Sequence, residues 1–179
     1  MSRAPSRRMA LALLTTARMP WRHATEKDAV GSRYNGPVYP HSWSGQELLV
    51  TEQRVGSDLI HELCHWLVAP KNRRNAREFG LGDPSWPDVV FQGERLLRSG
   101  SSNNEEATVA VLDAYIHYIL GRRWCSRALA LYLVFDHVKT WNALLDGDAY
   151  EDNSNRRLWR TLVRRGLTRR VRGIIQRVS

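Results

Sequence analysis

The residues most suited to chemistry are two histidines and a glutamate in the spacing His-Glu-x-x-His, which the chain carries as His61-Glu62-Leu63-Cys64-His65. Residues four apart lie one turn apart on the same face of an α-helix, so both imidazoles can reach one metal ion. A shuffled chain of this composition would contain the pattern only about 0.01 times. The spacing therefore predicts a metal site on a helix.

The predicted chemistry is hydrolysis. Neutral imidazole nitrogens suit Zn²⁺, and a catalytic zinc ion has three protein ligands and a fourth position open to water. The ion lowers the pKa of bound water to about 7, so Glu62, next to the first ligand, can complete its deprotonation as general base. We expect a zinc metallopeptidase that cleaves a peptide bond through metal-bound water.

The third ligand must come from elsewhere in the chain. Five side chains are candidates: Glu105, Glu106, Asp113, His117 and His137. We favour Glu106, because it begins a predicted long helix and the small Ala107 after it lets a neighbouring helix approach closely. Glu105 is the alternative, since sequence does not decide a shift of one residue. An acidic first turn that complements the helix dipole also explains this pair.

The motif needs a helix, and the residues around it predict one. Apolar residues recur at helical spacing from Leu59 to Leu67, Ser57 or Asp58 can cap the start, and Pro70 lies just beyond the end. A brief strand is expected at 47–51, before this helix. Cys64 and Trp66 are expected to be core residues.

The other segments predict a mainly α protein with a small β element, an α+β fold. Glycine, proline and serine predict a loop over 31–45. Apolar periodicity predicts further helices. Their expected ranges are 72–78, 103–120, 127–138, and one or two basic amphipathic helices over 158–178 that are interrupted near Gly166 and Gly173.

With these residues in view, the chain resembles the gluzincin class of zinc metallopeptidases. The similarity covers Asp58 to Ala69 (DLIHELCHWLVA) and Asn103 to Asp113 (NNEEATVAVLD). The resemblance implies a zincin-like core, His61 and His65 as ligands, Glu62 as base, and a glutamate ligand from the second helix, here Glu106 or Glu105.

The chain departs from the gluzincin pattern after that glutamate. Gluzincins carry an acid four residues further on that orients a histidine, whereas this chain has Val109 and Ala110 there. Asp113, one turn further, is a candidate for this task, and a backbone carbonyl is another. An oxyanion-stabilising group is unassigned. The weak candidates, each also explained as structural, are Tyr115, His117, Tyr118 and His137.

A second resemblance points to different chemistry. His61 to Gly80 (HELCHWLVAPKNRRNAREFG) is similar to elongation factor P hydroxylase, an iron-dependent enzyme, in His-Glu-x-x-His-Trp, a nearby Arg-Arg pair and a Phe-Gly. Two imidazoles and one carboxylate with open positions also suit Fe²⁺ and oxygen chemistry. An iron-dependent protein hydroxylase is therefore the alternative enzyme, with Fe²⁺ in place of Zn²⁺.

The positive charge of the chain is concentrated at its end. The net charge is +9, and 153–179 holds nine arginines and no acid, so the remaining 18 basic and 18 acidic residues balance. We therefore predict a metallopeptidase-like domain over 1–152 and a basic amphipathic helical extension over 153–179. The arginines expected to meet nucleic acid or another anion are Arg156, Arg157, Arg160, Arg164, Arg165, Arg169 and Arg170. A non-catalytic binding or assembly protein is a third hypothesis.

Composition also bears on location. Two cysteines, Cys64 and Cys125, are too few for a disulfide-rich scaffold. No stretch reaches the roughly 20 apolar residues of a membrane-spanning helix. A cytoplasmic protein is predicted, in which the basic segment from Met1 to Arg22 forms a first amphipathic helix; an organellar transit peptide is the alternative reading of that segment.

Overall fold

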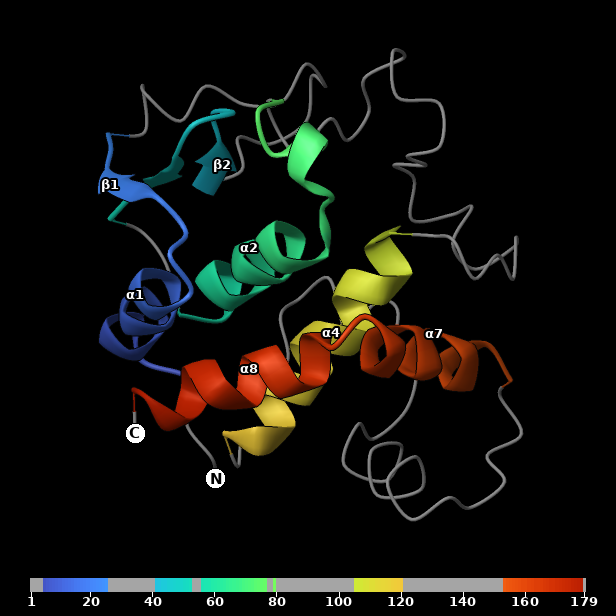
Figure 1. Cartoon of the computed structure of the whole chain (residues 1–179). Helices are drawn as coiled ribbons and strands as arrows, with labels where there is room; N and C mark the ends of the chain where they lie inside the picture. Colours follow the sequence, from blue (N-terminus) through green and yellow to red (C-terminus); the bar gives the residue numbers. More distant parts are fainter. Residues whose placement is uncertain are drawn as a thin grey trace.

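The helices of the protein outnumber its short strands in the computed structural model of the chain, which describes residues 5–25, 41–52, 56–76, 79, 105–120 and 153–178 (Figure 1). The helices are α1 (Arg7–Thr16), α2 (Gly56–Val68), the 3-10 turn η1 (Lys71–Arg73), α4 (Glu105–Ile119), α7 (Asn153–Arg164) and α8 (Leu167–Gln176). The strands are β1 (Trp21–His23), β2 (His41–Trp43) and β3 (Leu48–Val50). The expected α+β class, mainly helical with a small sheet, is confirmed.

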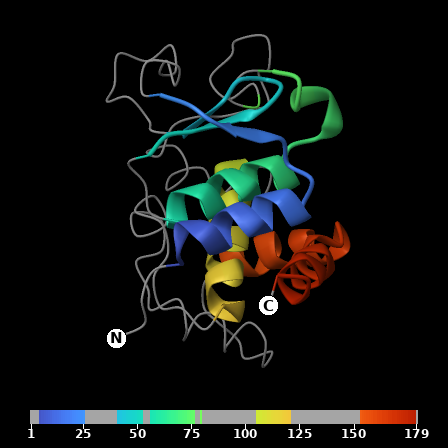
Figure 2. The same cartoon turned by 90° about the vertical axis from the view of Figure 1, so that its left-hand side faces the viewer.

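The three strands form one small mixed sheet with β3 at its centre. β1 pairs with β3 in parallel and β2 pairs with β3 in antiparallel, so Leu48 lies between Trp21 and Trp43. All three residues of β3 are buried. This strand is the one predicted at 47–51. Figure 2 shows the sheet on one side of α1 and α2, with α7 and α8 on the other side.

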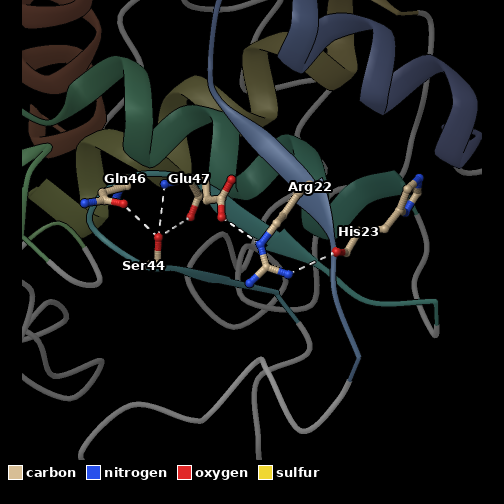
Figure 3. A network of polar contacts seen from close by, with 5 residues as sticks. All are labelled: Arg22, His23, Ser44, Gln46 and Glu47. Atoms are coloured by element: carbon tan, nitrogen blue, oxygen red, sulfur yellow. Dashed lines mark hydrogen bonds and ion pairs between the residues drawn. The ribbon is translucent and has the colours of Figure 1, made fainter.

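The turn between β2 and β3 is held by Ser44 (Figure 3). Its hydroxyl accepts from the amides of Gln46 and Glu47 at 3.2 and 3.0 Å and lies 2.9 Å from the Glu47 carbonyl. Gly45 has φ 96°, which a glycine adopts without strain. Arg22 Nε donates to Glu47 Oε1 at 2.7 Å and joins β1 to this turn. Both side chains are exposed, so the pair contributes only about 0–1 kcal/mol.

The motif helix α2 packs against α1 and α4. Leu59, Ile60, Leu63 and Leu67 are buried along it, together with Leu13 and Leu14 of α1. Ser6 caps α1 by accepting from the Met9 amide at 3.2 Å. The expected first amphipathic helix therefore forms part of the core.

Two sequence predictions about local structure are wrong. A helix was expected over 72–78, but the described residues form the 3-10 turn η1 and a further turn to Ala76. The indole of Trp43 donates to the Arg74 carbonyl at 2.8 Å, so a side chain takes the acceptor that a continuing helix would use. A break was expected near Gly173, but α8 runs through it, because Val171, Ile174 and Ile175 are buried on either side.

The other expected break, at Gly166, is confirmed. α7 ends at Arg164 and α8 begins at Leu167, with Gly166 between them at φ 68°. The predicted helix at 127–138 and most of the predicted loop at 31–45 lie outside the described residues. None of the described helices has the length and apolar character needed to cross a membrane.

α4 packs against α2, α7 and α8. The apolar faces of α7 and α8 belong to the same core as α1 and α2. Buried residues from the two helices are Leu158, Leu162, Leu167, Val171, Ile174 and Ile175. The basic segment at 153–179 therefore contributes to the core, while the predicted domain boundary at 152/153 stays a prediction.

Gly56, the first residue of α2, lies close to the backbone of Pro5 and Ser6. A Cβ there would lie 2.5 Å from the Pro5 carbonyl oxygen and 2.7 Å from that of Ser6. We expect Gly56→Ala to destabilise the fold by about 1–3 kcal/mol, because backbone must move. Gly173→Ala is the matched control, since its Cβ meets nothing within 4 Å. The control should gain about 0.5–1 kcal/mol through helix propensity. Urea unfolding measures both, and equal effects would contradict the prediction.

Candidate metal centre

His61 and His65 face each other on one side of α2, as the motif requires. Their Nε2 atoms are 3.1 Å apart, and their rings are nearly perpendicular, with centroids 4.7 Å apart. Two nitrogens bound to one tetrahedral zinc ion at about 2.0–2.1 Å would lie roughly 3.3 Å apart. The two imidazoles therefore fit a shared metal ion through their Nε2 atoms.

The other edge of His61 faces a carboxylate of α4. Asp113 is fully buried, and its Oδ2 lies 3.5 Å from His61 Nδ1. Its Oδ1 lies 3.1 Å from Nε2 of His117, one turn along α4. An ionised carboxylate only accepts hydrogen bonds, so each nitrogen facing it carries the proton. This assigns the proton of neutral His61 to Nδ1 and leaves the Nε2 lone pair for a metal.

The charge of Asp113 is retained despite its burial. Burial alone would raise its pKa, but the imidazoles of His117 and His61, whose ring nitrogens face the carboxylate at 3.1 and 3.5 Å, outweigh this and lower the pKa from 3.8 to about 2. A buried charge is costly unless such donors face it. Asp113 is therefore a charged acceptor throughout the neutral range, which is what orienting a ligand histidine requires.

His65 lies deeper than His61 and is nearly fully buried. Burial first, and then the nearby charges of His61 and Arg73, lower its pKa well below 6.5, although Asp113 opposes the shift. Its imidazole is consequently neutral near pH 7. Metal binding requires the neutral form, so no proton has to be displaced.

An aromatic cluster packs against His65. Phe79 stacks on the His65 ring with centroids 5.8 Å apart and planes 13° apart. Trp43 of β2 stacks on the other side of Phe79, 5.1 Å away, and also contacts Trp66. Phe79 has φ 55°, an uncommon value for a bulky residue. The packing therefore holds the ring of His65 in place through a residue under backbone strain.

Sequence reasoning missed this cluster as a support for the site. In sequence the Phe-Gly and the Arg-Arg pair point only to the hydroxylase resemblance, whereas in the structure Phe79 and Arg74 contact the motif helix. Phe79 contacts His65, and the Arg74 guanidinium lies 4.3 Å from the centroid of the Trp66 ring. The available signal was the density of aromatic residues in the chain, which holds seven tryptophans.

The third ligand is the part of the site that the described side chains leave open. Glu105 and Glu106 lie in the first turn of α4, but their side chains are outside the described set. Among described residues, no three histidine, cysteine or acidic side chains gather to hold one ion. Asp113 faces the Nδ1 edge of His61 rather than the paired Nε2 atoms, and His117 contacts Asp113. Glu106 lies seven residues before Asp113, two turns along the same face.

The other side chains considered for the site differ in burial and in their neighbours. Glu62 is half-buried, and Cys64 is a buried core residue whose thiol pKa is raised, chiefly by burial. This confirms the core assignment of Cys64. Tyr115 packs on Trp159 with centroids 5.0 Å apart and accepts a hydrogen bond from Arg172, so it faces α7 and α8. Tyr118 is half-buried, and His137 lies outside the described residues.

The basic residues of the tail are mostly exposed. Arg160, Arg164, Arg165, Arg169 and Arg170 are exposed, and the side chains of Arg156 and Arg157 are outside the described set. Arg165 also reaches the motif helix, where its Nη2 donates to the Val68 carbonyl at 2.6 Å. The tail therefore contacts the end of α2.

Replacing Asp113 by Asn should destabilise the metal-free protein in a pH-dependent way. Because the folded-state pKa of Asp113 is lowered to about 2 from 3.8, its charge stabilises the fold at neutral pH by about 2 kcal/mol. This stabilisation is present above pH ~4 and is lost as the pH falls towards ~2. Urea unfolding in the presence of a chelator should give Asp113→Asn a lower free energy of unfolding than the wild type at pH 7. This difference should shrink below pH 4.

The exposed Glu47→Gln serves as the control that also removes one carboxylate. It should lose no more than about 1 kcal/mol, because the Arg22–Glu47 pair is solvated. A loss in Asp113→Asn as small as in this control would contradict the buried-charge interpretation.

Comparison with known proteins gives no further support to either resemblance. The chain matches no protein-family model, no curated protein and no solved structure. The interpretation of the site therefore rests on the residues and geometry described above.

Proposed function

We propose that the protein is a metal-dependent hydrolase, a zinc metallopeptidase that cleaves a peptide bond with Glu62 as general base. The observation that carries the proposal is the pair of Nε2 atoms 3.1 Å apart, one of them on a histidine whose Nδ1 faces a buried carboxylate. Carboxylate, histidine and metal in this order form a common arrangement in zinc sites. In this proposal the helices α2 and α4 correspond to the two ligand-bearing helices of a zincin-like core.

Each residue has a distinct task in the proposed reaction. His61 and His65 would hold the ion, and the favoured third ligand is Glu106, with Glu105 as the alternative. When bound, Zn²⁺ supplies a water of lowered pKa and polarises the substrate carbonyl. Glu62 accepts a proton from the attacking water and returns it to the leaving amine. Asp113 keeps the proton of His61 on Nδ1, and the stacked Phe79 fixes the ring of His65.

A purely structural explanation of the two histidines is a hydrogen bond between their Nε2 atoms, which are within hydrogen-bond distance. That explanation gives no task to the glutamate that stands between them in the motif. Here the atoms that meet are both Nε2, while Asp113 faces Nδ1 of His61. The half-buried Glu62 beside them is the residue that hydrolysis adds to a simple metal site.

The metal content of the purified protein tests the proposed centre. We expect one equivalent of zinc in the wild type, measured by inductively coupled plasma mass spectrometry, and less than a tenth of that in His65→Ala. Glu106→Gln should lower zinc affinity by about 10-fold or more, whereas Glu105→Gln should leave it unchanged. Glu47→Gln is the control for loss of an exposed carboxylate.

The outcomes of this measurement separate the hypotheses. If Glu105→Gln lowers zinc affinity and Glu106→Gln does not, Glu105 is the third ligand and the zinc hydrolase proposal stands. One equivalent of iron instead of zinc would overturn it in favour of the iron-dependent hydroxylase. Absence of any metal after reconstitution would overturn the metal centre itself.

Glu62→Gln separates metal binding from hydrolysis. The amide cannot accept the proton of the attacking water, so peptidase activity on a casein or peptide-library substrate should fall by at least ~100-fold. The zinc content should remain at the wild-type level, because Glu62 is not a ligand in this proposal. Undiminished turnover in the zinc-loaded variant would disprove the general-base assignment.

A further inference from the structure

The helices α7 and α8 have one apolar and one basic face. Their apolar residues are buried against α4 and the rest of the core, whereas most of their arginines are exposed. The exposed arginines are Arg160, Arg164, Arg165, Arg169, Arg170, Arg172 and Arg177. At about 1.5 Å per residue, 12 and 10 residues give basic faces roughly 18 and 15 Å long.

Arginines from two parts of the chain meet at the C-terminal end of α2. Arg165 donates to the Val68 carbonyl at 2.6 Å, and Nε of Arg74 donates to the next carbonyl, that of Ala69, at 3.2 Å. Adjacent acceptors bring these two guanidinium groups close together. Burial, followed by the charges of Arg170 and Arg165, lowers the pKa of Arg74, so Arg170 belongs to the same group.

This group of arginines has an excess of positive charge. Within the described part of the chain, no carboxylate forms an ion pair with Arg74, Arg165 or Arg170. The carbonyl end of α2 offers only a partial negative charge, equivalent to about −0.5. Like charges held at this distance repel each other, and a bound anion would relieve the repulsion. Each guanidinium has five N–H donors. Capping α2 uses one donor nitrogen of Arg74 and one of Arg165, so the other donors remain for a bound anion.

We propose that the exposed arginine face of α7 and α8, with Arg74 beside it, binds the phosphate backbone of a nucleic acid without reading its bases. The arginines are spread along both helices, which matches a ligand with regularly repeated charges rather than one compact anion. All nine basic residues of 153–179 are arginine. Arginine is the side chain best suited to bind phosphate oxygens in pairs.

A lipid surface fits this face less well. Helices that lie in a membrane interface insert an apolar side into the acyl region. Here that side is buried in the core, and among described residues the single exposed large hydrophobic is Val163, at 50%. The face can touch a charged surface but has nothing to insert into a membrane.

An acidic peptide also fits less well. Peptide-binding surfaces commonly combine charge with a strand edge or an apolar groove. The outer sides of α7 and α8 provide helical backbone, already hydrogen-bonded, and no exposed apolar anchor beyond Val163 among the described residues. Phosphate contacts need only the guanidinium groups that are present.

The test uses the full chain, because α7 and α8 are part of the core and their removal would unfold it. Fluorescence anisotropy with a labelled 20-base-pair duplex and a 20-nucleotide single strand, from 50 to 200 mM salt, measures affinity and its salt dependence. We expect Arg164→Gln/Arg170→Gln to weaken duplex binding about 10-fold or more at 100 mM salt and to make the log–log salt slope shallower by about 2. Both residues are exposed, so circular dichroism and the thermal midpoint should not change.

The matched control removes the same charge elsewhere. Arg8→Gln/Arg18→Gln changes two exposed arginines near the ends of α1 and should alter affinity by less than about 2-fold. Equal losses of duplex affinity in both double variants would overturn the proposal, because binding would then depend on net charge alone. Absence of binding to either nucleic acid at 50 mM salt would overturn it, as would equal or tighter binding to polyglutamate or to vesicles containing anionic lipid. This test is independent of metal content and peptidase activity.

Discussion

Asp113 carries a charge at a position with no exposed surface, and such a charge persists only while donors face its oxygens. His117 comes from the same helix, but His61 comes from α2, so the contact works only when α2 and α4 keep one register. A shift of either helix would leave a carboxylate and two imidazoles buried with incomplete partners. The same contact sets the proton of His61 on Nδ1 and directs Nε2 towards His65. One buried charge thus couples the packing of the core to the chemistry of the candidate site.

The parts of the site that sequence could predict are those set by contacts within one helix. The spacing of His61 and His65, and the helix that ends before Pro70, depend on neighbours at most a few residues away. Asp113 as the partner of His61 was only one of two candidates, because that choice depends on how two helices 52 residues apart pack. Phe79 and Trp43 were missed for the same reason. Phe79 stacks on His65 and Trp43 stacks on Phe79, which joins a strand, a turn and a helix, and no local pattern encodes that arrangement.

The errors in secondary structure have the same origin. Gly166 and Gly173 look alike in sequence, yet of the two only Gly166 has a positive φ, because it lies at the break between α7 and α8. Gly173 lies where buried neighbours hold the helix together, so its low helix propensity is overridden. Likewise, residues after Asn72 have helical character, but the indole of Trp43 takes the carbonyl of Arg74. In each case a tertiary contact outweighs a local preference of about 1 kcal/mol.

The position of α7 and α8 has a consequence for the motif helix. α4 packs against α2 and also against these two helices, so the apolar side of the tail supports the helix that presents Asp113. Its basic side meets α2 directly, because Arg165 caps the Val68 carbonyl one turn beyond His65. A helix whose last carbonyls are capped frays less, which keeps the second histidine at a fixed position. An anion that draws Arg165 away from Val68 would loosen that end of α2. The basic face and the candidate metal centre are therefore joined through one helix, and this gives a bound polyanion a physical route to the site.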